Sequence, residues 1–137
     1  MQFIIEGKPQ SKLRARTVRN QYTGKVHSYT PKKTMDYENK VKWSYATAGG
    51  QYYGDKPLRV TIQAFYPIPK GFNKTKRKSA LQGLIRPQAK PDCDNVVKGV
   101  LDALNGVAYH DDNQVVSVSC DKYYAEAGHL IVNITEI

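Results

Sequence analysis

The stretch Leu58-Arg59-Val60-Thr61-Ile62-Gln63-Ala64-Phe65-Tyr66 is the clearest strand in the sequence. Apolar side chains occupy every second position and alternate with mainly polar ones, which is the period of a half-buried strand. Pro67 and Pro69 follow at once and end the pattern. A strand with one apolar face must bury that face against another layer. The stretch therefore predicts a sheet with one covered face.

The sequence on either side of this strand supplies the rest of the sheet and its cover. We expect further strands over residues 2–7, 115–124 and 130–137, and helices over 36–48, 74–84 and 95–105. Thr34 or Asp36 is the expected cap of the first helix, and Glu126-Ala127-Gly128 predicts a hairpin between the last two strands. These elements predict an α+β fold, a mixed β-sheet packed by helices, in a single domain over residues 1–137.

Length and composition exclude several other classes of protein. With 137 residues, of which 40% are hydrophobic and 24% charged, the chain has the balance of one ordinary globular domain. No apolar run is long enough for a membrane span, and the N-terminus turns polar too soon for a secretory signal. Two cysteines, Cys93 and Cys120, are too few for a disulfide framework. We therefore expect a cytoplasmic protein with no membrane partner.

The net charge of +9 divides unevenly along the chain. Residues 1–91 carry 19 Lys or Arg and 4 Asp or Glu, whereas residues 92–137 carry 2 and 8. The basic residues gather in loop-like stretches, which favours phosphate contacts over a merely solvated surface. The candidates for nucleic-acid contact are Lys8, Lys12, Arg14, Arg16, Arg19, Lys74, Lys76, Arg77, Lys78 and Lys90.

The acidic residues concentrate around Lys90-Pro91-Asp92-Cys93-Asp94-Asn95 and the helix that follows. We expect Asp92 and Asp94 in extended chain, with both carboxylates pointing the same way at the start of that helix. Alone, such a pair is more often a helix cap than a site. The downstream residues argue for a site: Asn95, Lys98, Asp102 and Asn105 share one helix face, and Asp111 or Asp112 follows in a loop that can fold back.

Converging carboxylates repel one another unless a cation lies between them. Oxygen ligands favour a hard divalent ion, Mg²⁺ with Mn²⁺ as a possible substitute. Such an ion supports phosphodiester hydrolysis, and a nearby lysine offsets charge on the phosphoryl oxygens. An acidic metal site within a basic chain therefore predicts a nuclease.

The run from Lys90 to Val115 resembles the signature of the RusA family of Holliday-junction resolvases. The resemblance extends to the segment 7–16 and to Tyr29-Thr30-Pro31, and it implies a RusA-like fold of phage or prophage origin. It implies a Mg²⁺-dependent homodimer that makes paired symmetric nicks in four-way DNA junctions during recombination and repair. The residues that match the family's motif are the acids Asp92, Asp94 and Asp112, the catalytic lysine Lys98, and the supporting positions Asn95, Asp102 and Asp111.

The sequence leaves two choices open, the identity of the third metal ligand and the function itself. The stretch before Asp111-Asp112 is about one residue shorter than in the best-known family member, so either acid can be the third metal ligand. The alternative functions are a non-catalytic nucleic-acid-binding protein and a metal-dependent nuclease acting on flaps or other branched DNA. Neutralising an acid distinguishes the first of these, because only a nuclease loses activity.

Overall fold

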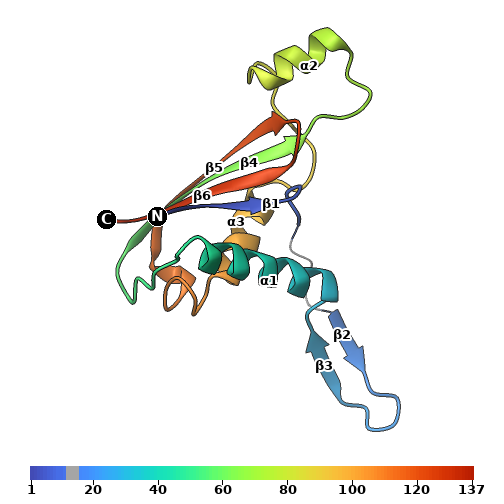
Figure 1. The fold of residues 1–137 in the computed structure, drawn as a ribbon. Helices are drawn as coiled ribbons and strands as arrows, with labels where there is room; N and C mark the ends of the chain where they lie inside the picture. The colour runs from blue at the N-terminus through green and yellow to red at the C-terminus, as the bar shows by residue number, and fades with distance from the viewer. Residues whose placement is uncertain (12–15) are drawn as a thin grey trace.

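The computed structural model describes residues 1–11 and 16–137, and its centre is a four-stranded sheet (Figure 1). The strand order is β1-β6-β4-β5, and β4 is the strand predicted around Ile62. The bounds are β1 (Gln2–Glu6), β4 (Leu58–Pro67), β5 (Val115–Ala125) and β6 (His129–Glu136). The buried side chains of β4 alternate as the sequence predicts, so this strand forms the middle of the core.

The neighbours of β4 make the sheet mixed, as predicted. β4 runs parallel to β5 and antiparallel to β6. The predicted hairpin between the last two strands is wrong, because β4 lies between β5 and β6. This order gives β4 a partner strand on both sides, so the backbone N–H and C=O groups of the most buried strand can be satisfied within the sheet.

Helices α1 (Lys32–Thr47) and α3 (Cys93–Ala103) lie against one face of this sheet (Figure 1). The predicted stripe of Tyr37, Val41 and Tyr45 on α1 is buried, and so are Val96 and Val100 on α3. The α+β fold is therefore confirmed, with one core between the sheet and the two helices.

Helix α1 begins four residues earlier than the sequence predicts. Pro31 is its N-cap, and Thr34 is buried in the first turn instead of capping the helix. The ring of Pro31 holds φ at −55°, a value that already suits the start of a helix, so no side-chain cap is needed there.

Two elements extend from the sheet at opposite ends of Figure 1. Strands β2 (Arg16–Arg19) and β3 (Val26–Tyr29) pair antiparallel as a hairpin, in a stretch we expected to be a basic loop. The predicted helix after residue 74 is confirmed as α2 (Lys74–Leu81), and the Asn73 side chain caps it by accepting from the Lys76 N–H at 2.8 Å. Both elements are largely exposed, and both carry basic residues.

Among the helices of the described residues, none has the length and apolar character needed to span a membrane.

Candidate active site

The start of α3 places the first two predicted acids. Asp92 is the N-cap, and its side chain accepts a hydrogen bond from the Asn95 N–H at 3.1 Å. Asp94 lies in the first helical turn, so our prediction of extended chain at this residue is wrong. The cap and the favourable helix dipole allow the helix to start directly after Asp92. Both carboxylates therefore lie at the positive end of α3.

A groove of about 580 Å³ lies between α3 and β5, beside these carboxylates. It contains most of the predicted site in one place. The lining residues are Asp92, Asp94, Asn95, Val97, Lys98, Leu101, Asp102, Asp112 and Val118. Asn105, predicted on the same helix face, lies beyond the end of α3 and is not part of the lining. The fold thus brings four carboxylates from two segments of the chain to one groove that also holds a lysine.

Asp112 enters this groove from the short 3-10 turn η1 (Asp112–Gln114). Burial, a hydrogen bond with Asp102 and repulsion from Asp102 and Asp111 raise the pKa of Asp112 above its ordinary value. Asp111 precedes the turn, and its backbone N–H donates to Gln114 Oε1 at 3.1 Å. Asp112 lines the groove and Asp111 does not, so the structure distinguishes two acids that the sequence could not separate.

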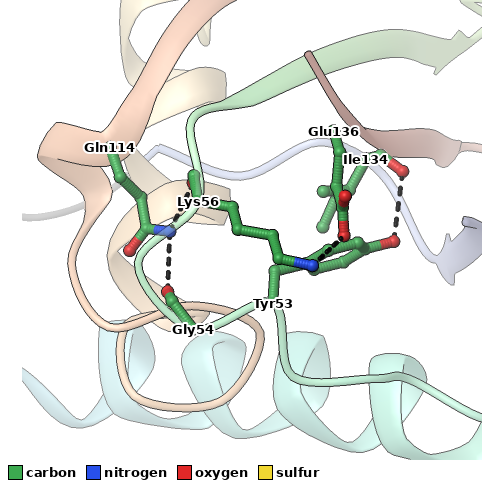
Figure 2. A network of polar contacts seen from close by, with 6 residues as sticks. All are labelled: Tyr53, Gly54, Lys56, Gln114, Ile134 and Glu136. Carbon is green, nitrogen blue, oxygen red and sulfur yellow. Dashed lines mark hydrogen bonds and ion pairs between the residues drawn. The ribbon is translucent and has the colours of Figure 1, made fainter.

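The turn that carries Asp112 is held by Gln114, a residue to which the sequence analysis gave no role. Figure 2 shows that its side-chain Nε2 donates to the Gly54 carbonyl at 2.7 Å and to the Lys56 carbonyl at 2.8 Å. The same segment is tied to β6 by an ion pair from Lys56 to Glu136 at 3.1 Å. The position of Asp112 therefore depends on contacts with residues about sixty positions earlier in the chain.

The two ends of α3 are held by buried tyrosines. At the N-terminal end, the Tyr66 hydroxyl donates to the carbonyl of Pro91, directly before Asp92. At the C-terminal end, the Tyr109 hydroxyl donates to the Leu101 carbonyl at 2.5 Å. Burial raises the pKa of both phenols, so they stay neutral donors at physiological pH. These bonds fix the helix that carries most of the groove's acids.

Basic residues form a second, smaller cavity of about 220 Å³ next to the Asp92 end of the groove. Its lining comprises Lys8, Pro9, Gln10, Ser11, Lys33, Lys90 and Pro91. The loop before β6 reaches this region, where the Gly7 N–H donates to the Gly128 carbonyl at 3.0 Å. A Cβ at Gly128 would lie 2.6 Å from the Lys8 Cα, so only glycine allows this approach. Three lysines from distant segments therefore meet beside the acids.

The other residues predicted to contact DNA are exposed, ion-paired or outside the described part of the chain. Lys74, Lys76 and Lys78 lie along the largely exposed α2, and Arg19 is exposed on the hairpin. Arg77 instead forms an ion pair with Glu126 at 3.0 Å, which ties α2 to the loop after β5. Lys12, Arg14 and the side chain of Arg16 lie outside the described residues.

The donor set of the groove suits a hard cation, because the negatively charged donors are carboxylates. The raised pKa of Asp112 reflects the crowding of negative charge that a cation would relieve. As the side chains stand within the described ranges, no three His, Cys, Asp or Glu form a set that could hold a metal.

Comparison with known proteins gives the following matches. The family model described as Endodeoxyribonuclease RusA matches residues 6–135. "Uncharacterized protein YqaN" of Bacillus subtilis (strain 168) is 36% identical over 140 residues, covering all of this chain and 96% of that protein. "Crossover junction endodeoxyribonuclease rusA" of Lactococcus phage r1t is 24% identical over 115 residues, covering 83% of this chain and 81% of that protein.

Proposed function

This chain belongs to the RusA family of endodeoxyribonucleases, and from that premise we propose that it resolves four-way DNA junctions by paired, Mg²⁺-dependent nicks. The observation that carries the proposal is the groove between α3 and β5. There Asp92, Asp94 and Asp112 lie with Lys98 in one hollow of an otherwise strongly basic chain. Acids gathered in this way are costly for a structural surface and useful for phosphodiester hydrolysis.

The acids have two kinds of role in this proposal. Asp92, Asp94 and Asp112 would hold Mg²⁺, or Mn²⁺ in its place, and a bound ion supplies an activated water and charge stabilisation at the leaving oxygen. Asp102 lies close to Asp112 and would orient it through a proton shared between the two carboxyl groups. Asp111 directly precedes Asp112 in the chain, and its negative charge raises the pKa of Asp112. The Asn95 N–H fixes the Asp92 carboxylate by donating to it.

Lys98 supplies positive charge at the scissile phosphate. It lies one helical turn after Asp94 and lines the same groove. Its ammonium can approach the non-bridging phosphoryl oxygens, where negative charge develops during hydrolysis. The backbone that carries Lys98 is part of a packed helix, and its exposed side chain can reach across the groove to the phosphate.

The basic residues outside the groove hold the DNA. Lys8 and Lys90 would position the backbone next to Asp92, with the lysines of α2 gripping an arm of the junction further away. The hairpin extends in the opposite direction and offers Arg19 to another arm. Two symmetric nicks require two active sites related by a two-fold axis, so the working form is a homodimer.

A panel of DNA substrates tests this function. Wild-type protein is incubated with a synthetic four-way junction, a flap, a plain duplex and a single strand, each with Mg²⁺, Mn²⁺ or EDTA. We expect two symmetric nicks in the junction, slower cleavage of the other substrates, and no cleavage in EDTA. Faster cutting of the flap would assign the site to another branched substrate. Binding that is salt-dependent but never accompanied by cleavage would show a non-catalytic binding protein.

A further inference from the structure

We propose that the small basic cavity beside Asp92, which we call the lysine pocket, binds one phosphate of the cleaved DNA strand. This phosphate lies within two nucleotides of the one that is hydrolysed, so the pocket sets the position of the strand in the catalytic groove. The residues that hold it are Lys8, Lys33 and Lys90. The inference rests on the proposed function and specifies which part of the substrate meets this surface.

The lysine pocket receives positive charge from three separate segments of the chain. Lys8 comes from the loop after β1, Lys33 from the first turn of α1 and Lys90 from the segment before α3, and all three are exposed. No Asp or Glu is among the lining residues, and within the described part of the chain none of the three lysines forms an ion pair. Positive charges gathered at one place repel one another, and an anion bound between them removes that repulsion.

The start of α1 adds to this positive potential. Its N-cap is Pro31, which provides no side-chain hydrogen bond, and its first turn contains no acidic residue. At α3, by contrast, Asp92 and Asp94 occupy the corresponding positions. The positive end of the α1 dipole is therefore not offset by a carboxylate of its own first turn. A phosphate in the lysine pocket would lie near this end, because Lys33 belongs to that turn.

The size and lining of the pocket suit a single phosphate group. Its volume of about 220 Å³ is below the ~300–1,000 Å³ of clefts that enclose a whole small-molecule ligand. Pro9 and Pro91 are buried in the lining whereas the lysines are exposed, so rigid rings form the floor and ammonium groups the rim. Gln10 and Ser11 add neutral polar groups, and no aromatic side chain lines the pocket. Such a lining favours a phosphate over a base, which binds best by stacking on an aromatic ring.

The segment that carries Lys90 is held on both sides of this residue. Directly before it, the Ala89 carbonyl accepts a hydrogen bond from Lys122 Nζ at 2.7 Å. Directly after it, the Pro91 carbonyl accepts a hydrogen bond from the buried Tyr66 hydroxyl. Both donors belong to strands of the central sheet, so the backbone of this wall of the pocket is fixed relative to the core.

The lysine pocket adjoins the catalytic groove directly. Pro91 lines the pocket and the next residue, Asp92, lines the groove. The Cα atoms of such neighbours are only ~3.8 Å apart. A strand whose scissile phosphate lies among the acids therefore passes the pocket within one or two nucleotides. Phosphate contacts fix the register of a protein on DNA without reading its sequence, so a phosphate held here determines which bond faces Asp92.

A double-mutant cycle between protein and DNA tests the pocket. Four-way junctions carry one uncharged methylphosphonate in each cleaved strand, at one of the phosphates within two nucleotides of the cut. At one of these positions, wild type should cut ~10-fold or more slowly at subsaturating protein. In Lys33→Ala this penalty should shrink by ~3-fold or more, because one partner of the contact is already missing. Lys32→Ala, at an exposed neighbour outside the lining, is the matched control and should keep the wild-type penalty.

Three outcomes would overturn the phosphate contact. They are a wild-type protein indifferent to every methylphosphonate, a penalty of the same size in Lys33→Ala and wild type, and an equal shrinkage in Lys32→Ala. Failure of the nuclease proposal is distinct, because the same cycle can be measured without cleavage, as the dissociation constant of junctions modified around the branch point in EDTA. A binding penalty that shrinks in Lys33→Ala, with no cleavage in Mg²⁺, would support the pocket and refute the nuclease.

Discussion

Helices α2 and α3 begin in the same way and serve different purposes. Each starts at a residue whose side chain caps the helix, Asn73 in α2 and Asp92 in α3. α3 then buries Val96, Gly99, Val100 and Ala103, whereas α2 buries only Ala80. The packed helix and its N-cap carry three of the four acids of the groove, and the lightly packed helix carries exposed lysines. Under the proposed function, this difference would place the chemistry on a rigid element and the hold on DNA on a more loosely attached one.

The largest expected effect is on the cleavage rate, and it comes from removing the negative charge of Asp92 at the start of α3. Asp92→Asn keeps the helix cap, because asparagine caps as well as aspartate, but it loses the negative charge in the groove. We expect junction cleavage in Mg²⁺ to fall by ~10²-fold or more, with binding of the junction unchanged. Single-turnover cleavage assays and gel-shift titrations measure the two quantities.

The matched control is Asp121→Asn, which removes one negative charge outside the groove. Asp121 is exposed on β5 and is absent from the lining of the catalytic groove. Its variant should cut at the wild-type rate. Equal losses in Asp92→Asn and Asp121→Asn would mean that total charge matters and not the groove.

A second prediction concerns the support of the groove. Gln114→Ala leaves the carbonyls of Gly54 and Lys56 without their side-chain donor. We expect the free energy of unfolding to drop by ~1–3 kcal/mol and cleavage to slow because Asp112 is held less firmly. Urea unfolding and single-turnover assays measure these changes. Asn113→Ala, an exposed neighbour on the same turn, should do neither, and an equal effect there would refute the role of Gln114.

Substitutions on the loosely packed helix α2 should lower the affinity for the junction and leave the cleavage rate unchanged. Replacing Lys74 and Lys78 together by alanine should weaken junction binding and reduce the salt dependence of log K by ~0.9 for each phosphate that is no longer neutralised. Cleavage at saturating protein should stay at the wild-type rate. Titrations at several salt concentrations measure the slope, with Lys42→Ala on α1 as the control. A slower rate at saturation would place α2 in the catalytic machinery instead.

The smallest expected effect is on stability. Asp112 has a raised pKa in the fold, so its ionised form destabilises the folded state. The stabilisation from the protonated form is present below the ordinary pKa of 3.8 and is lost as the pH rises through the raised value. Without divalent ions, Asp112→Asn should therefore melt slightly higher than wild type at pH 7, with the gap closing as the pH falls below the ordinary pKa. Thermal melts at the two ends of this range measure it, and a lower melting temperature at pH 7 would contradict this interpretation.

The parts of the fold that follow from the sequence are those that face the core. The alternation around Ile62 and the four-residue spacing of Tyr37, Val41 and Tyr45 both mark buried faces, and each produced the expected element. The acids on α3 were placed for the same reason, because the apolar stripe through Val96 and Val100 fixes which face points outward.

The parts that the sequence could not predict are those without a buried face or those set by distant contacts. The strands β2 and β3 have exposed side chains wherever these are described, so they show no alternation to detect. The place of β4 between β5 and β6 depends on pairing across the chain. The role of Gln114 depends on carbonyls about sixty residues away, which no local pattern indicates.

The most direct test of the division between the two helices combines one substitution from each. Junction affinity and single-turnover cleavage are measured for wild type, Asp94→Asn, the Lys74/Lys78 double-alanine variant and all three changes together. We predict that Asp94→Asn lowers only the rate, that the lysine changes lower only the affinity, and that the combined variant shows both losses without interaction. Cleavage by Asp94→Asn at the wild-type rate, or a strong coupling between the two sets of changes, would contradict the account.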